Sequence, residues 1–223
     1  MALHFVFFIS AVKDTSILNA TVFVNTTPIF SMFVSALVFR LKPSQLAMGG
    51  VAVSFAGILV IAYAETLGLG MNLGSVVSSA SVVGDLEAMA AAVVEAFYLN
   101  YGRRVRGQSD ILAIMLPIYA LAAISVSLLS FPLTFAAPTL PVGFTSTLSI
   151  LALGLIPTAM AHTLYFSSLS NLKSFETATM ALLEPIGATL LGAALFSEYP
   201  TFPFIVGAVL ILLGIVLVVK NPQ

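Results

Sequence analysis

Long uninterrupted apolar runs limit what this chain can fold into more than any other feature of its sequence. A transmembrane helix needs roughly 20 consecutive, mostly apolar residues, and seven runs reach that length. They lie at about residues 16–39, 44–64, 84–102, 110–131, 147–171, 174–197 and 202–220, and a shorter apolar piece, 1–12, precedes them. The apolar residues are continuous rather than alternating, which favours helices over the strands of a barrel. We therefore predict an all-α integral membrane protein.

Composition supports this class and excludes others. Hydrophobic residues make up 60% of the 223-residue chain and charged residues 8%, whereas about a quarter of a soluble domain is charged. A net charge of -1 gives no reason to expect a nucleic-acid partner. The chain has no cysteine and two distant histidines, so we expect no disulfide, metal site or other cofactor.

Basic residues at the ends of the runs predict the orientation of the helices, because Lys and Arg remain preferentially on the cytoplasmic side. If the connections alternate between the two sides, one side holds only Lys13. The other side holds Arg40, Lys42, Arg103, Arg104, Arg106, Lys173 and Lys220. We therefore expect a multi-pass protein of the cell membrane with a cytoplasmic C-terminus and an external loop at 65–83.

The chain also repeats itself when it is shifted by 157 residues. Two whole helices superpose without a gap, and the identical pairs are Pro28/Pro185, Ala36/Ala193, Phe39/Phe196, Pro43/Pro200, Gly50/Gly207, Gly57/Gly214 and Ile58/Ile215. The copy of each helix is the fifth predicted helix after it, and an odd offset makes the copies point in opposite directions across the bilayer. An inverted repeat of this kind is common in secondary transporters. We expect the four glycines to serve close helix packing at the periphery.

The motifs, taken in order, resemble the EamA family of the drug/metabolite transporter superfamily. They are "NATVFVNTTPIFSMFVSALVF" with "GGVAVSFAGILVI", and "GDLEAMAAAVVEAFYLNYGRR" with "LGLIPTAMAHTLYFSSL" and "ALLEPIGATLLGAALFSE". The resemblance implies two inverted five-helix repeats around a central cavity, cytoplasmic termini, and transport of metabolites or drugs. Relative to that pattern, 84–220 is a complete second repeat, 65–83 is the external loop, and 1–64 is only the last two and a half helices of the first repeat.

Two neighbouring residues, Glu184 and Pro185, interrupt an apolar span near its middle. An ionised carboxylate at that depth costs about 2.5 kcal/mol or more unless it faces protein or water. Pro185 cannot donate to the carbonyl of Ala181, so a kink and a free acceptor are expected. Glu184 either faces a cavity or bonds a neighbouring backbone as a packing feature. Pro28 occupies the corresponding kink of the first copy, beside Thr27.

Glu95 is a further acid within a predicted span, two turns before Arg103. The resemblance implies a bulky apolar residue there, so the carboxylate needs compensation. We expect it to face the cavity and bind a cationic or hydroxylated substrate or a proton. The alternative is a protonated side chain bonded to the next helix.

Several other polar residues could line the same cavity. His162 lies near the middle of its span, and His4 takes the corresponding place when one residue is gapped. Each could exchange a proton or simply join helices. The same two alternatives hold for Asn25, Thr27, Asn100 and Asn19.

Two classes of function follow from these residues. The first is a transporter of small molecules, working by alternating access between the inverted repeats. The second is a scaffold or incomplete subunit that needs a partner chain. An enzyme is not expected, because no motif combines a nucleophile, a base and metal ligands.

The N-terminal piece is too short to cross a bilayer, since 13 helical residues extend about 20 Å against a core of about 30 Å. We therefore expect further residues upstream of Met1. A short form that tilts or forms a homodimer is the alternative. With the first repeat incomplete, we also expect His4 and Glu95 to be exposed toward lipid.

The orientation can be tested by single-cysteine labelling, because the natural chain has no cysteine. A membrane-impermeant reagent should reach a cysteine at position 72 from outside, and one at position 104 only after the membrane is opened. Labelling in the reverse pattern would contradict the predicted orientation.

Overall fold

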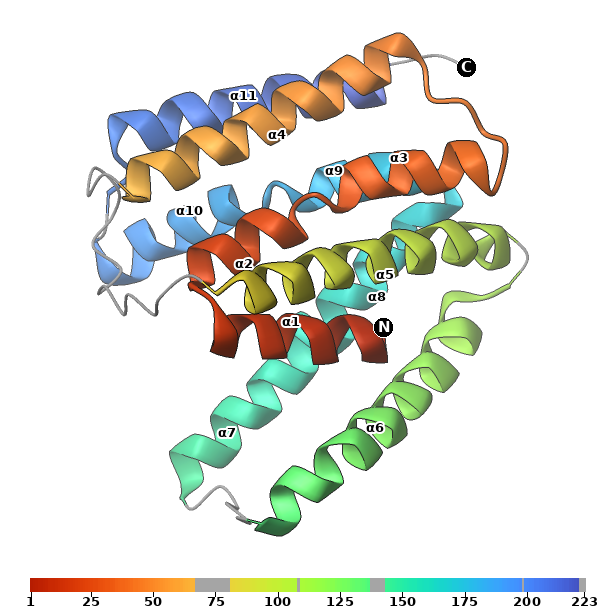
Figure 1. The fold of residues 1–223 in the computed structure, drawn as a ribbon, viewed down its shortest axis with the longest axis vertical. Helices are drawn as coiled ribbons and strands as arrows, with labels where there is room; N and C mark the ends of the chain where they lie inside the picture. Colours follow the sequence, from red (N-terminus) through yellow and green to blue (C-terminus); the bar gives the residue numbers. More distant parts are fainter. Residues whose placement is uncertain (67–80, 108, 137–142, 198, 221–223) are drawn as a thin grey trace.

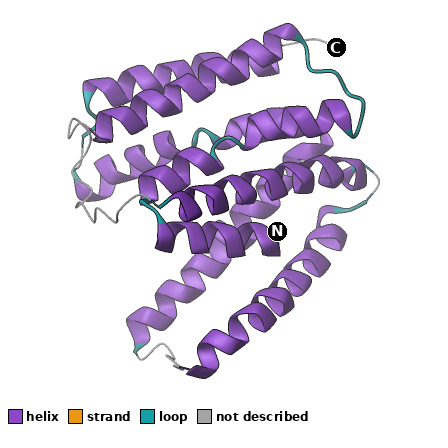
Figure 2. Ribbon diagram, viewed as in Figure 1, coloured by secondary structure: helices purple, strands orange, loops and turns teal. Residues whose placement is uncertain are grey.

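The computed structural model describes residues 1–66, 81–107, 109–136, 143–197 and 199–220. Every regular element in these ranges is a helix, as Figures 1 and 2 show. The helices are α1 (Ala2–Asp14), α2 (Ile17–Val24), α3 (Thr27–Leu37), α4 (Gln45–Thr66), α5 (Val82–Arg106), α6 (Ile111–Ala136), α7 (Phe144–Leu153), η1 (Gly154–Ala161), α8 (His162–Ser167), η2 (Ser168–Ser170), α9 (Ser174–Ala181), α10 (Glu184–Phe196) and α11 (Phe202–Val219). The prediction of an all-helical membrane chain is therefore confirmed.

Six stretches of the described chain are long and apolar enough to cross a membrane. They are Ile17–Leu37, Gln45–Tyr63, Ile111–Leu129, Phe144–Ser170, Ser174–Leu195 and Phe202–Val219, and each overlaps a predicted span. The seventh predicted span, 84–102, is helical within α5 but is not among the six. Its acids and three terminal arginines make α5 much less apolar than the others. Most of the predicted loop 65–83 lies outside the described residues.

Both copies of the repeat break at the same place. In the first copy α2 ends at Val24 and α3 begins at Thr27; in the second, α9 ends at Ala181 and α10 begins at Glu184. The two linking residues in each copy keep right-handed helical dihedral angles, so the axis bends without a loop. Proline is the second residue of the next helix in each copy, and its missing N–H explains why the ladder cannot continue.

A third proline widens a helix instead of breaking it. The segment η1 is a π-helix that contains Pro157 and joins α7 to α8 without a gap. Inserted π-turns are one of the usual ways in which a helix accommodates a disrupted hydrogen-bond ladder.

Glycines bring the last helices of the two copies together, which gives the predicted close packing its partner helices. In Figure 1, α4 and α11 lie side by side along one edge of the bundle. A side chain at Gly50 would meet the backbone of Gly214, and one at Gly57 would meet the backbone of Gly207. Between these pairs the Ser54 hydroxyl donates to the carbonyl of Ile211, 3.2 Å away. The contacts are reciprocal: each copy uses the same two glycine positions.

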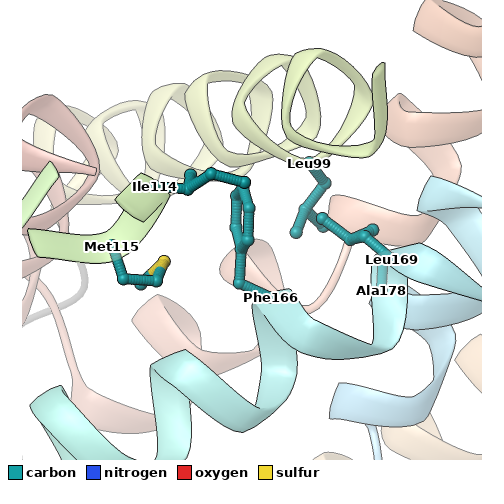
Figure 3. Packing of buried hydrophobic residues seen from close by; sticks show 6 residues of the cluster. All are labelled: Leu99, Ile114, Met115, Phe166, Leu169 and Ala178. Carbon is teal, nitrogen blue, oxygen red and sulfur yellow. The ribbon is translucent and has the colours of Figure 1, made fainter. Parts of the chain in front are cut away.

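Helix α5 lies at the centre of the described bundle and packs against α1, α2, α3 and α9. Its buried face is made of small residues, with Ala88, Ala91, Ala92 and Ala96 fully covered. Small residues let the neighbouring helices approach closely, which is how helices associate in a bilayer. Toward the C-terminus of α5, an apolar cluster joins this helix to α6, α8, η2 and α9 (Figure 3). The cluster consists of Leu99, Ile114, Met115, Phe166, Leu169 and Ala178.

Helices α6 and α7 extend away from this bundle, as Figure 1 shows. Large apolar side chains of α7, such as Phe144 and Leu148, are exposed. Exposed apolar surface suits a helix whose solvent is lipid.

The glycine contact predicts a clear contrast between two neighbouring positions. A Cβ on Gly50 would lie 2.7 Å from the Gly214 carbonyl oxygen, whereas a Cβ on Gly49 meets nothing within 4 Å. We expect Gly50→Ala to destabilise the protein by about 1–3 kcal/mol through overpacking. Gly49→Ala should be neutral or stabilise by up to about 1 kcal/mol. Thermal unfolding in detergent measures both; equal shifts in Tm would contradict the packing argument.

Candidate functional site

A histidine and a glutamate meet where α1 lies along the middle of α5. The Nδ1 atom of His4 lies 3.2 Å from Oε2 of Glu95 and 3.1 Å from the carbonyl oxygen of Ala91. Because a carbonyl can only accept, Nδ1 carries a hydrogen and donates it between these two oxygens. The Nε2 atom is then the one that can gain or lose a proton.

The expectation that His4 and Glu95 are exposed to lipid is wrong. Their side chains are 13% and 15% exposed. The physical reason is that α1 packs closely along the alanine face of α5, so each group covers the other. Their pairing also provides the compensation that a carboxylate at this depth requires.

The second histidine approaches the same place from α8. The ring of Phe5, next to His4, packs edge-on against His162 with the ring centroids 5.4 Å apart. One acid and two histidines that are distant in sequence therefore lie near one another: His4 contacts Glu95, and His162 packs against Phe5, the neighbour of His4. We call this group, Glu95, His4 and His162, the central polar cluster.

Asn100 lies five residues after Glu95 on α5 and joins α5 to α3. Its side chain is buried, and its amide nitrogen lies 3.0 Å from the Ser31 hydroxyl, 3.2 Å from the Ser31 carbonyl and 2.8 Å from the Ala96 carbonyl. Its oxygen accepts from the Ser35 hydroxyl at 2.6 Å. Both the nitrogen and the oxygen of the Asn100 amide are therefore hydrogen-bonded within the protein. This favours the alternative in which Asn100 joins helices over the one in which it lines a cavity.

Thr27 closes the backbone gap that Pro28 makes in the first copy. Pro28 has no N–H for the carbonyl of Val24, and the Thr27 hydroxyl donates to that oxygen at 2.7 Å. Asn25 lies in the same bend and, like Thr27 and Pro28, is buried. This hydrogen bond favours the alternative in which Thr27 joins helix segments over the one in which it lines a cavity.

Among the described residues, the break between α9 and α10 has no hydroxyl that donates to the carbonyl freed by proline. Glu184 stands where the first copy has Thr27, and a carboxylate cannot donate. In the described part of the chain, no hydrogen bond is made by the Glu184 carboxylate and no side chain donates to the Ala181 carbonyl. Glu184 is an exposed residue, so the alternative in which it bonds a neighbouring backbone has no support.

Sequence reasoning missed a second polar layer at the start of α5. The Thr15 hydroxyl and the Asn19 amide donate to the same oxygen of Asp85, at 2.8 and 3.3 Å. One turn deeper, the Ser10 hydroxyl donates to Glu87 at 2.9 Å. The signal was the pair of acids in the first turns of a predicted span, where they complement the helix dipole. This layer fixes α1 and α2 on α5.

Comparisons with known proteins agree with this geometry. The model of the EamA-like transporter family matches residues 1–63 and 82–220. The chain belongs to this family. Two proteins of Archaeoglobus fulgidus, each named an uncharacterized transporter, are both 25% identical to it. The first match covers 97% of this chain and 72% of the relative, and the second 91% and 67%. A solved crystal structure at 20% identity has a TM-score of 0.76 and covers 96% of this chain and 71% of its own.

The family predicted from the motifs is thus confirmed, and the chain is a multi-pass membrane transporter. The solved structure at this identity supports the fold alone. The central polar cluster gives this EamA-like chain a carboxylate and two imidazoles close together near the middle of α5.

Thr27 and Thr21 provide a matched test of the closed break. The Thr21 hydroxyl also bonds a carbonyl, that of Ile17 at 2.8 Å, but on an exposed face and in an unbroken turn. We expect Thr27→Val to cost about 1–3 kcal/mol, because it leaves the Val24 carbonyl without a donor inside the protein. Thr21→Val should change stability by about 0.5 kcal/mol or less. Thermal unfolding of the two variants in detergent measures these changes in stability. A larger loss of stability in Thr21→Val than in Thr27→Val would contradict the role of the Thr27 hydroxyl.

Proposed function

We propose that this chain is a secondary transporter of small polar metabolites or drugs, with the central polar cluster as its substrate or proton site. The observation that carries the proposal is the His4–Glu95 pair, covered by protein at the middle of α5. Ionisable residues are costly within a bilayer and are retained mainly where they act on a substrate, an ion or a proton. The charges at the outer end of α5, by contrast, are engaged in joining helices.

Glu95 is the primary binding group in this proposal. Its carboxylate can attract a cationic or hydroxylated group of a substrate, or hold a proton when the substrate is absent. His4 donates to it, and His162 supplies a second imidazole from the opposite copy of the repeat. Glu184 adds an acid that is open to the surroundings of the cluster.

Alternating access is the mechanism that fits this arrangement. The helix breaks fall at equivalent positions of the two copies, and the α4–α11 contact is reciprocal. Both features support two inverted repeats that can exchange conformations around a site near the midplane. In the first repeat this chain carries the last two and a half helices of that pattern. We propose that the protein lies in the cell membrane with a cytoplasmic C-terminus, as the basic residues predict.

Charge-neutral variants test the roles of the acids. Purified protein is reconstituted into vesicles loaded with a pH-sensitive dye, and amino acids and the cationic drug ethidium are supplied as probes. Glu95→Gln should abolish or re-specify flux while the protein stays folded. Glu184→Gln should mainly change turnover or stability. It should not abolish flux, because the Glu184 carboxylate makes no hydrogen bond to the groups that would bind the substrate.

Glu87→Gln is the matched control, since it alters an acid of the same helix and glutamine can still accept from Ser10. It should leave flux close to that of the natural protein. Equal and mild effects of all three changes would argue against Glu95 as the binding group. Absence of flux with the unaltered protein for every probe would argue against the proposed activity itself.

A further inference from the structure

The turn that leads into His162 is the most unusual backbone segment of the described helices. Residues 154–161 form the π-helix η1 within the span, and His162 follows it directly. Inside η1, Pro157 cannot donate to the carbonyl of Leu153, and the Thr158 hydroxyl takes that oxygen at 3.0 Å. Wide turns of this type are often found at functional sites.

A tyrosine from the neighbouring helix α6 holds the other side of this turn. The Tyr119 hydroxyl lies 3.1 Å from the carbonyl oxygen of Thr158 and 3.0 Å from that of Ala159. It also lies 2.8 Å from the hydroxyl of Thr163. A phenol has one hydrogen, so Tyr119 donates toward the two carbonyls and accepts from Thr163. These contacts fall before and after His162 in the chain.

The groups that face His162 come from other helices. They are the ring of Phe5 on α1, packed edge-on against the imidazole, and the adjoining His4–Glu95 pair of α1 and α5. Helix α6 contributes Tyr119, which contacts the backbone around His162. A small rotation of the wide turn would therefore move the imidazole relative to every charge of the central polar cluster.

We propose that Tyr119 is a positioning residue, whose hydroxyl fixes the wide turn and thereby holds the His162 imidazole against Phe5, beside the His4–Glu95 pair. The inference rests on the proposed function in one respect: His162 must belong to the site for its position to affect transport. Tyr119 touches neither substrate nor proton in this arrangement. Its effect is transmitted through the backbone at Thr158 and Ala159.

The chain has only two histidines, which makes a direct measurement practical. Protein with isotope-labelled histidine is titrated by NMR in lipid nanodiscs, and His4→Gln assigns the two signals. In Tyr119→Phe we expect the titration midpoint of His162 to move by about half a pH unit or more. The pH profile of flux should move with it. Tyr63→Phe, which alters an exposed tyrosine on α4, should change neither.

A folded Tyr119→Phe variant with an unaltered His162 titration would overturn the proposal. If that variant fails to fold, Thr163→Val removes the hydroxyl that donates to Tyr119 and so loosens the hold of the phenol on the two carbonyls. It should move the His162 midpoint in the same direction by a smaller amount, with Thr163→Ser restoring the natural titration. An unaltered titration in Thr163→Val would then overturn it. A shift of the His162 midpoint in a protein that carries no flux would support the positioning role and reject the proposed transport instead.

Discussion

Backbone carbonyls that lose their N–H partner inside a bilayer must find another donor, and the described helices are arranged around that requirement. Thr27 donates to the carbonyl freed by Pro28, and Thr158 to the one freed by Pro157. Tyr119 supports the wide turn from a neighbouring helix. At Pro28 and Pro157, the hydroxyl of an adjacent threonine bonds the carbonyl four residues before the proline. The break at Pro185 differs, since a carboxylate stands in place of the hydroxyl.

The same restriction governs where charge is found. All three acids of α5 bond side chains from α1, its junction with α2, or α2 itself: Asp85 to Thr15 and Asn19, Glu87 to Ser10, and Glu95 to His4. The alanine face of α5 allows α1 to lie close enough for these contacts. Packing of small residues and pairing of polar groups therefore depend on each other. The result is a carboxylate–imidazole pair near the middle of α5, covered by protein.

Much of this could be predicted from the sequence because it depends on local pattern. The apolar runs located the helices, the 157-residue shift placed Pro28 and Pro185 at equivalent positions, and the four glycines indicated close packing. That the glycines of one copy pack against those of the other is shown by the structure. The motifs identified the family. The exposure of His4 and Glu95 was predicted wrongly, because a sequence shows that a group is costly in lipid but not which group lies opposite it. The π-helix before His162 left only Pro157 as a trace in the sequence.

The sequence by itself determined the membrane class, the helix positions, the repeat and the family, since these follow from hydrophobicity, proline and glycine spacing along one chain. Tertiary structure alone decided the hydrogen-bond partners. Whether Asn100 joins helices or lines a cavity depends on Ser31 and Ser35, some 65 to 69 residues away. Whether the helix break at Pro185 gains a hydrogen-bond donor also depends on neighbouring helices, and none of the described residues supplies one. Such pairings are set by how helices pack across the bundle, and no pattern along a single helix contains that information.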